Sequence, residues 1–146
     1  MPDKVLYEKR GEVAYITLNR PEVKNAIDVE CHELLCQYFT DFRDDPTMRV
    51  AVITGAGDAF TAGADLKTHA PEWQTVGPMV GRERIEDGLS GITRGPLSRI
   101  TKPIIASIDG WCLGHGIELV MACDLRICSD RAKFGTFEVR RGMHSA

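Results

Sequence analysis

The chain lacks any long apolar run, and no stretch approaches the ~18 consecutive apolar residues that a membrane-spanning helix requires. Its first twelve residues read MPDKVLYEKRGE, so an apolar segment at the N-terminus is also missing. A secretory signal is therefore not expected. These absences predict a cytoplasmic protein with no membrane partner.

An excess of basic charge is missing as well, because the formal net charge is −3 and the pI is about 5.8. A general positive field that would attract nucleic acid is not expected, and neither is a nucleic-acid partner. The five cysteines are odd in number and include no CxxC pair, which favours free thiols in a reducing compartment. The four histidines do not stand at ligand spacing, so no metal site is predicted.

The apolar patterning that is present predicts one layered α/β domain over residues 1–146. Alternating segments joined at Gly11-Glu12 predict a hairpin. Asp28 is suited to cap an amphipathic helix, and continuous apolar runs before glycine-rich loops are typical of buried parallel strands. The expected strands lie at 6–10, 13–19, 50–54, 104–108 and 125–128, and the expected helices at 29–44 and 116–122. Residues 69–100, with helical pieces at 82–89 and 97–100, are interpreted as a variable segment that covers a pocket.

A first glycine-rich loop, AFTAGADL, occupies residues 59–66. Its small residues let a ligand approach the backbone closely, and Asp65 can cap a short following helix. Taken alone, this segment is more simply a turn between a strand and a helix.

A second loop, LGHGIE, occupies residues 113–118, after a buried strand and at the start of an apolar helix. Unpaired N–H groups there suit an anion, either a phosphate or a developing enolate oxygen. A dinucleotide fingerprint is disfavoured because GHGIEL lacks the third glycine. A P-loop is excluded because no Gly-Lys-Ser/Thr follows.

Taken together, these segments resemble the crotonase (enoyl-CoA hydratase/isomerase) family. The resemblance runs from about residue 5 to residue 142 and includes LNRPEVKNAID, VAVITGAGDAF, FTAGADL and IDGWCLGHGIELVMACDLRICSDRAKFGTFEVRRG. It implies a spiral core of ββα units, an acyl-CoA thioester as partner, coenzyme A only as part of that substrate, and a homo-oligomer (a trimer or hexamer in full-length relatives).

The resemblance also sets an expectation for the end of the chain. Family members continue past residue 146 with a C-terminal helical region, so we expect a core truncated before that region, in either a fragment or a naturally short member. Such a chain should expose apolar side chains on its last elements.

The resemblance further assigns a catalytic constellation. The backbone N–H groups of Ala64 and His115 would hold the thioester oxygen, and Glu118 and Glu138 would share one water and exchange protons with the substrate. His115 is a departure, because the family usually has glycine there. Its imidazole either packs away from the substrate or makes an extra polar contact with it.

Contacts with coenzyme A are implied in the same way. The resemblance places Ala62, Asp65, Leu66 and Gly114 near CoA, and Arg20 and Lys24 at its phosphates. Asp65 is equally suited to be only a helix cap, and Arg20 to be only solvated.

Three functions stay open on these grounds. The first is hydration of a trans-2-enoyl-CoA, favoured by the two glutamates. The second is another crotonase chemistry with one glutamate, either double-bond isomerisation or thioester hydrolysis. The third is a truncated, non-catalytic protein that binds acyl-CoA.

Overall fold

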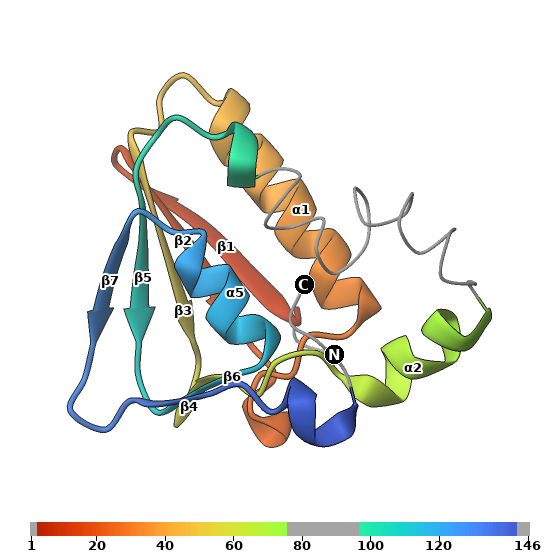
Figure 1. Ribbon diagram of the computed structural model, residues 1–146. Coiled ribbons are helices and arrows are strands. Elements are labelled where there is room, and N and C mark those ends of the chain that lie inside the picture. Colours follow the sequence, from red (N-terminus) through yellow and green to blue (C-terminus); the bar gives the residue numbers. More distant parts are fainter. Residues whose placement is uncertain (1–2, 76–96, 143–146) are drawn as a thin grey trace.

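A computed structural model describes residues 3–75 and 97–142 (Figure 1). The expected helical piece at 82–89 and most of the expected pocket cover lie outside the described residues. The elements in chain order are β1 (Val5–Arg10), β2 (Val13–Leu18), η1 (Pro21–Val23), α1 (Val29–Asp44), β3 (Val50–Gly55), β4 (Ala59–Thr61), α2 (Leu66–Thr75), η3 (Leu97–Arg99), β5 (Ile104–Ile108), β6 (Trp111–Leu113), α5 (His115–Met121), β7 (Leu125–Cys128), β8 (Lys133–Gly135) and η4 (Glu138–Arg141).

The main sheet has five strands in the order β1-β2-β3-β5-β7. Strands β1 and β2 form the predicted antiparallel hairpin, and the pairs β2–β3, β3–β5 and β5–β7 are parallel. All five of these strands were expected from the sequence. A second sheet of three parallel strands, β4-β6-β8, was not expected.

The two sheets are linked by a repeated connection. Each of β3, β5 and β7 is followed within a few residues by a strand of the small sheet and then by a helical segment, which is α2, α5 or η4 in turn. This repetition is the ββα unit that the resemblance implied. It gathers the small sheet and the segments that follow it at the end of the main sheet where the parallel strands finish (Figure 1).

The core lies on one face of the main sheet, where α1 and α5 pack (Figure 1). The register places Ala14 beside Ala51 and Ala51 beside Ile104, and all three side chains are buried. Because side chains alternate along a strand, the buried positions recur every second residue in β2, β3 and β5. The helices complete this core with Leu35, Phe39, Phe42, Leu119 and Val120.

Helix α1 confirms the expected cap and stop. The Asp28 carboxylate accepts a hydrogen bond from the Cys31 N–H at 2.8 Å, which satisfies one of the free donors of the first turn. The helix ends at Asp44, and Asp45 caps it just before Pro46.

Large apolar side chains are exposed on the last elements, as expected. They are Leu125 and Ile127 of β7, Phe134 of β8, Phe137, and Val139 of η4. No helix within the described ranges is long and apolar enough to cross a membrane. The same ranges contain no cluster of three or more His, Cys, Asp or Glu side chains placed to hold a metal ion.

Candidate active site

The first glycine-rich loop is held against the segment that precedes α1. The Ala62 N–H donates to the Lys24 carbonyl, the Ile27 N–H to the Gly63 carbonyl, and the Asp65 N–H to the Ile27 carbonyl, each at 2.8 Å. Of the two N–H groups beside Ala64, that of Asp65 is used in these bonds, and that of Gly63 donates to the Thr61 hydroxyl oxygen at 3.0 Å. The Ala64 N–H itself donates to no other group of the described residues.

Asn25 holds the first glycine-rich loop in place through hydrogen bonds. It is 1% exposed and has a left-handed φ of 55°. Its side-chain amide donates to the Ala56 and Ala59 carbonyls at 2.8 and 2.7 Å, and its own carbonyl accepts from the Thr61 hydroxyl at 2.6 Å. Sequence reasoning assigned Asn25 no role of its own, although it lies within LNRPEVKNAID. Its buried side chain fixes the path of the chain into the loop.

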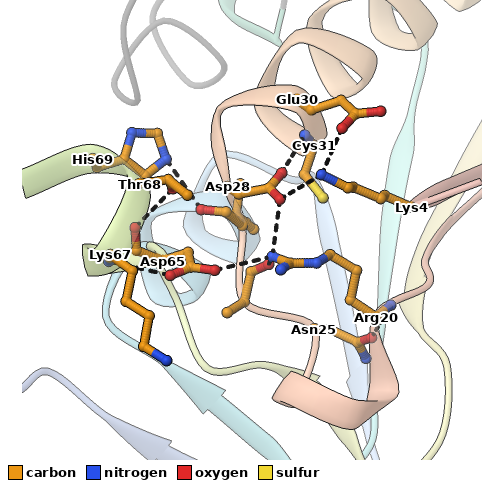
Figure 2. Close-up of polar contacts among 12 residues, drawn as sticks. Lys4, Arg20, Asn25, Asp28, Glu30, Cys31, Asp65, Lys67, Thr68 and His69 are labelled. Carbon is orange, nitrogen blue, oxygen red and sulfur yellow. Dashed lines mark hydrogen bonds and ion pairs between the residues drawn. The ribbon is translucent and has the colours of Figure 1, made fainter. Parts of the chain in front are cut away.

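Arg20 ties the same loop to the start of α1 (Figure 2). Its Nη1 donates to the Ala26 carbonyl at 2.6 Å and lies 3.2 Å from Asp65 and 3.3 Å from Asp28. Burial opposes ionisation of Asp28. Nevertheless, hydrogen bonds from Lys4 and Cys31, together with the Arg20 charge, hold the Asp28 pKa below its ordinary value. Asp65 also accepts from the Lys67 N–H, so it caps α2.

A hollow of about 360 Å³ lies beside the first loop and is lined by Lys24, Ala62, Trp111, Leu113 and Phe137. Two of the residues expected at CoA, Lys24 and Ala62, thus line one cavity. Leu66, at the start of α2, is 40% exposed. The Lys24 amine pairs with the exposed Asp58 carboxylate at 2.5 Å.

The second glycine-rich loop touches the first. A Cβ added to Gly63 would stand 2.7 Å from the Leu113 carbonyl oxygen and 3.2 Å from the His115 nitrogen, so only glycine permits this approach. Gly114 precedes α5 with φ 54° and ψ −123°, and its N–H donates to the Gly135 carbonyl at 2.9 Å. His115 is the first residue of α5, where an N–H has no partner within the helix.

Both predicted carboxylates lie at this second loop. The Glu118 Oε2 is 2.7 Å from the His115 Nδ1, and these side chains are 15% and 5% exposed. The Glu138 Oε1 lies 3.0 Å from the position of a Cβ on Gly114. The other Glu138 oxygen, Oε2, is buried and has no hydrogen-bond partner within residues 3–75 and 97–142, and an unsatisfied buried acceptor is rare in proteins.

Comparison with known proteins assigns the chain to a family. The sequence model of the enoyl-CoA hydratase/isomerase family matches residues 8–146. The chain belongs to this family. The solved enoyl-CoA hydratase of Mycobacterium tuberculosis H37Rv is 36% identical, with a TM-score of 0.82 over 98% of this chain and 52% of that one. The predicted fold class, a crotonase-like α/β core, is confirmed.

Curated members of the enoyl-CoA hydratase/isomerase family are also similar to this chain. An (E)-benzylidenesuccinyl-CoA hydratase of Thauera aromatica is 42% identical over 93% of this chain and 51% of its own length. A mevalonyl-coenzyme A hydratase of Aspergillus fumigatus is 41% identical over 90% of this chain and 46% of its own length. The chain thus spans about half the length of the curated relatives it matches.

Within this family framework, the structure separates the predicted site residues into two groups. One group surrounds the meeting point of the two loops and consists of Ala64, Gly114, His115, Glu118 and Glu138. The other group lies around the first loop alone and consists of Arg20, Lys24, Ala62, Asp65 and Leu66. Their contacts with CoA stay a prediction, and so do the catalytic roles.

Proposed function

We propose that the chain carries the catalytic constellation of an enoyl-CoA hydratase, which adds water across the 2,3 double bond of a trans-2-enoyl-CoA. The observation that carries this proposal is the close contact of residue 63 with residues 113–115, beside which Glu118 and Glu138 both lie. The relatives that hydrate CoA thioesters support water addition as the reaction class. Coenzyme A enters as part of the substrate, and the reaction needs no separate cofactor.

In this proposal the thioester oxygen accepts hydrogen bonds from the Ala64 and His115 N–H groups. Addition of hydroxide to the β-carbon moves negative charge onto that oxygen, so donors already in place stabilise the transition state more than the substrate. The loss of one such donor costs about 2.7–4 kcal/mol in other enzymes.

The carboxyl groups of Glu118 and Glu138 transfer the protons of the reaction. Glu118 takes one proton from water as the hydroxyl adds to C3, and protonated Glu138 gives one proton to C2. Return of a proton from Glu118 to Glu138 restores both groups, so one whole water molecule enters the product. The buried Oε2 of Glu138, which has no hydrogen-bond partner among the described residues, is a suitable site for the proton that Glu138 delivers. Isomerisation or thioester hydrolysis would require only one of the two glutamates.

The CoA portion of the substrate would occupy the hollow lined by Lys24 and Ala62. Leu66 and Gly114 are its further proposed contacts. Arg20 and Asp65 would act mainly by orienting the loop, because each side chain is about 15% exposed and engaged with the other. Of Arg20 and Lys24, it is Lys24 that faces solvent, because its side chain is 48% exposed.

The test is hydration of crotonyl-CoA by the purified protein, followed as loss of the ultraviolet absorbance of the conjugated thioester. We expect Glu118→Gln and Glu138→Gln each to lower kcat by about 10²–10⁴-fold, the usual contribution of general acid–base catalysis. Both variants should still bind an unreactive acyl-CoA. The matched control is Glu22→Gln, an exposed glutamate of η1, and it should stay within twofold of wild type.

Other outcomes would overturn the proposal in distinct ways. Full activity in either glutamine variant would remove that residue from the mechanism. Release of free thiol, or a shifted double bond in the product without added water, would indicate hydrolysis or isomerisation. Binding of acyl-CoA without any turnover would indicate a binding protein.

A further inference from the structure

We infer that His115 is a positioning residue for Glu118: its imidazole holds the Glu118 carboxylate in place and in its ionised form. This inference rests on the proposed hydratase function and adds to it a side chain where the family usually has glycine. The two side chains share helix α5 and stand one turn apart, at positions i and i+3. Residues at this spacing face each other along a helix.

The geometry of the pair is that of a strong hydrogen bond. The Nδ1···Oε2 separation is 2.7 Å, the short end of the range for a nitrogen donor and a charged carboxylate. The side chains are only 5% and 15% exposed, so water cannot readily replace the bond once it is lost. A donor to the charged form of a carboxyl group favours that form. Glu118 is thereby kept ready to accept a proton from water.

Burial of the other imidazole nitrogen, Nε2, sets the tautomer. Nε2 is buried and has no hydrogen-bond partner in the part of the chain that the structure describes. A proton on Nδ1 is used in the bond to Glu118, whereas a proton on Nε2 would be buried without an acceptor. The arrangement therefore favours the tautomer that is protonated at Nδ1.

The position of His115 gives the pair a further consequence. The backbone N–H of His115 is one of the two proposed donors to the thioester oxygen, and its side chain holds the proposed base. His115 therefore fixes the position of the Glu118 carboxylate relative to the thioester carbonyl of the substrate. Among the described residues, Glu138 of η4 and Cys112 of β6 are the other titratable groups in this part of the site, and burial raises the pKa of Cys112 to about 12.

The decisive experiment is a double-mutant cycle on crotonyl-CoA hydration with His115→Ala, Glu118→Gln and the double variant. A hydrogen bond to a charged group contributes about 1.5–3 kcal/mol, which corresponds to a loss of kcat of roughly ten- to a hundredfold. We expect that loss in His115→Ala, little change in KM, and no further loss when the same change is made in Glu118→Gln. His115→Gln, which keeps an N–H donor, should recover part of the activity.

The pH profile distinguishes positioning from packing. Removal of the donor makes Glu118 ionise at higher pH, so the acidic limb of the kcat profile should move upward in His115→Ala. An equal loss at every pH, or a loss that persists in the Glu118→Gln background, would overturn the inference and leave the hydratase proposal intact. Absence of turnover in the wild type would overturn both.

If a His115 variant misfolds, the inference can still be tested by a measurement that needs neither activity nor that variant. Nitrogen-15 NMR of the imidazoles should show neutral His115 in the tautomer that carries its proton on Nδ1, and Glu118→Ala should shift its signals. The imidazole of His69, which belongs to α2 and contacts the Ile27 carbonyl, is the internal control. Unchanged His115 signals in Glu118→Ala would contradict the inference whatever the activity.

Discussion

The contact between the two glycine-rich loops can be tested with one methyl group. In Gly63→Ala the new Cβ would stand 2.7 Å from the Leu113 oxygen, closer than Cβ atoms approach real neighbours, and Gly63 has a φ of 90°. The left-handed backbone costs an alanine about 1–2 kcal/mol. Forcing the extra carbon against backbone atoms costs about 1–3 kcal/mol more. We therefore expect the free energy of unfolding to fall by about 2–5 kcal/mol, a large share of the ~5–15 kcal/mol of an ordinary domain.

Gly11→Ala is the matched control, because Gly11 also has a left-handed φ, 60°, but a Cβ there meets nothing within 4 Å. It should lose only the backbone cost of about 1–2 kcal/mol. Urea unfolding of both variants measures the difference, which isolates the steric cost of separating residue 63 from residues 113–115. Equal destabilisation of the two variants would show that the loops do not approach as closely as the structure has them, and the oxyanion site would lose its basis.

Two further predictions concern ionisable groups. The Asp28 pKa is lowered, so the stability that this carboxylate contributes is present above its unfolded value of about 3.8 and is lost as the pH falls below it. Asn caps a helix as well as Asp does, so Asp28→Asn should destabilise the protein at pH 7 and much less at pH 3, as measured by urea unfolding at both pH values. Burial raises the pKa of the Cys31, Cys112 and Cys123 thiols to about 12, whereas Cys128 is exposed. Alkylation of the native protein followed by mass spectrometry should therefore label Cys128 first, and rapid labelling of the three buried thiols would contradict the packing.

The sequence predicted the main sheet and missed the small one for a physical reason. Strands β3 and β5 are apolar runs that end in glycine-containing turns, and α1 has a cap, an apolar face and a stop, so each is visible locally. Strands β4, β6 and β8 have three residues each, too few to show an alternation. They form because partners about 50 and 20 residues away in the chain pair with them, and no local pattern records such pairing.

The candidate site likewise contains residues that the sequence revealed and residues that it did not. The loops and both glutamates were found by motif, because their residue types stand at fixed spacing. Asn25 was missed because its role depends on a left-handed φ and on carbonyls from a segment more than thirty residues away. The bond between His115 and Glu118 was not predicted either, although the i and i+3 spacing was visible. Without knowledge that His115 is buried on α5 with little room around it, an imidazole at that position has no preferred direction.

The charges around the first loop show why a motif alone does not assign a phosphate site. Arg20 and Lys24 are both cations in the same stretch, yet their partners differ in burial. Arg20 is 16% exposed between Asp28 and Asp65. Removing it would leave Asp65 without a cation among the described residues and Asp28 with Lys4 alone, which is costly. Lys24 pairs with Asp58 where the two side chains are 48% and 66% exposed, and such a surface pair contributes at most about 1 kcal/mol. A phosphate can therefore replace Asp58 as the partner of Lys24 at little cost, whereas recruiting Arg20 would dismantle the network that orients Ala64. Of the two cations, Lys24 is the one that the fold leaves available to a phosphate, and we propose it as the contact with coenzyme A.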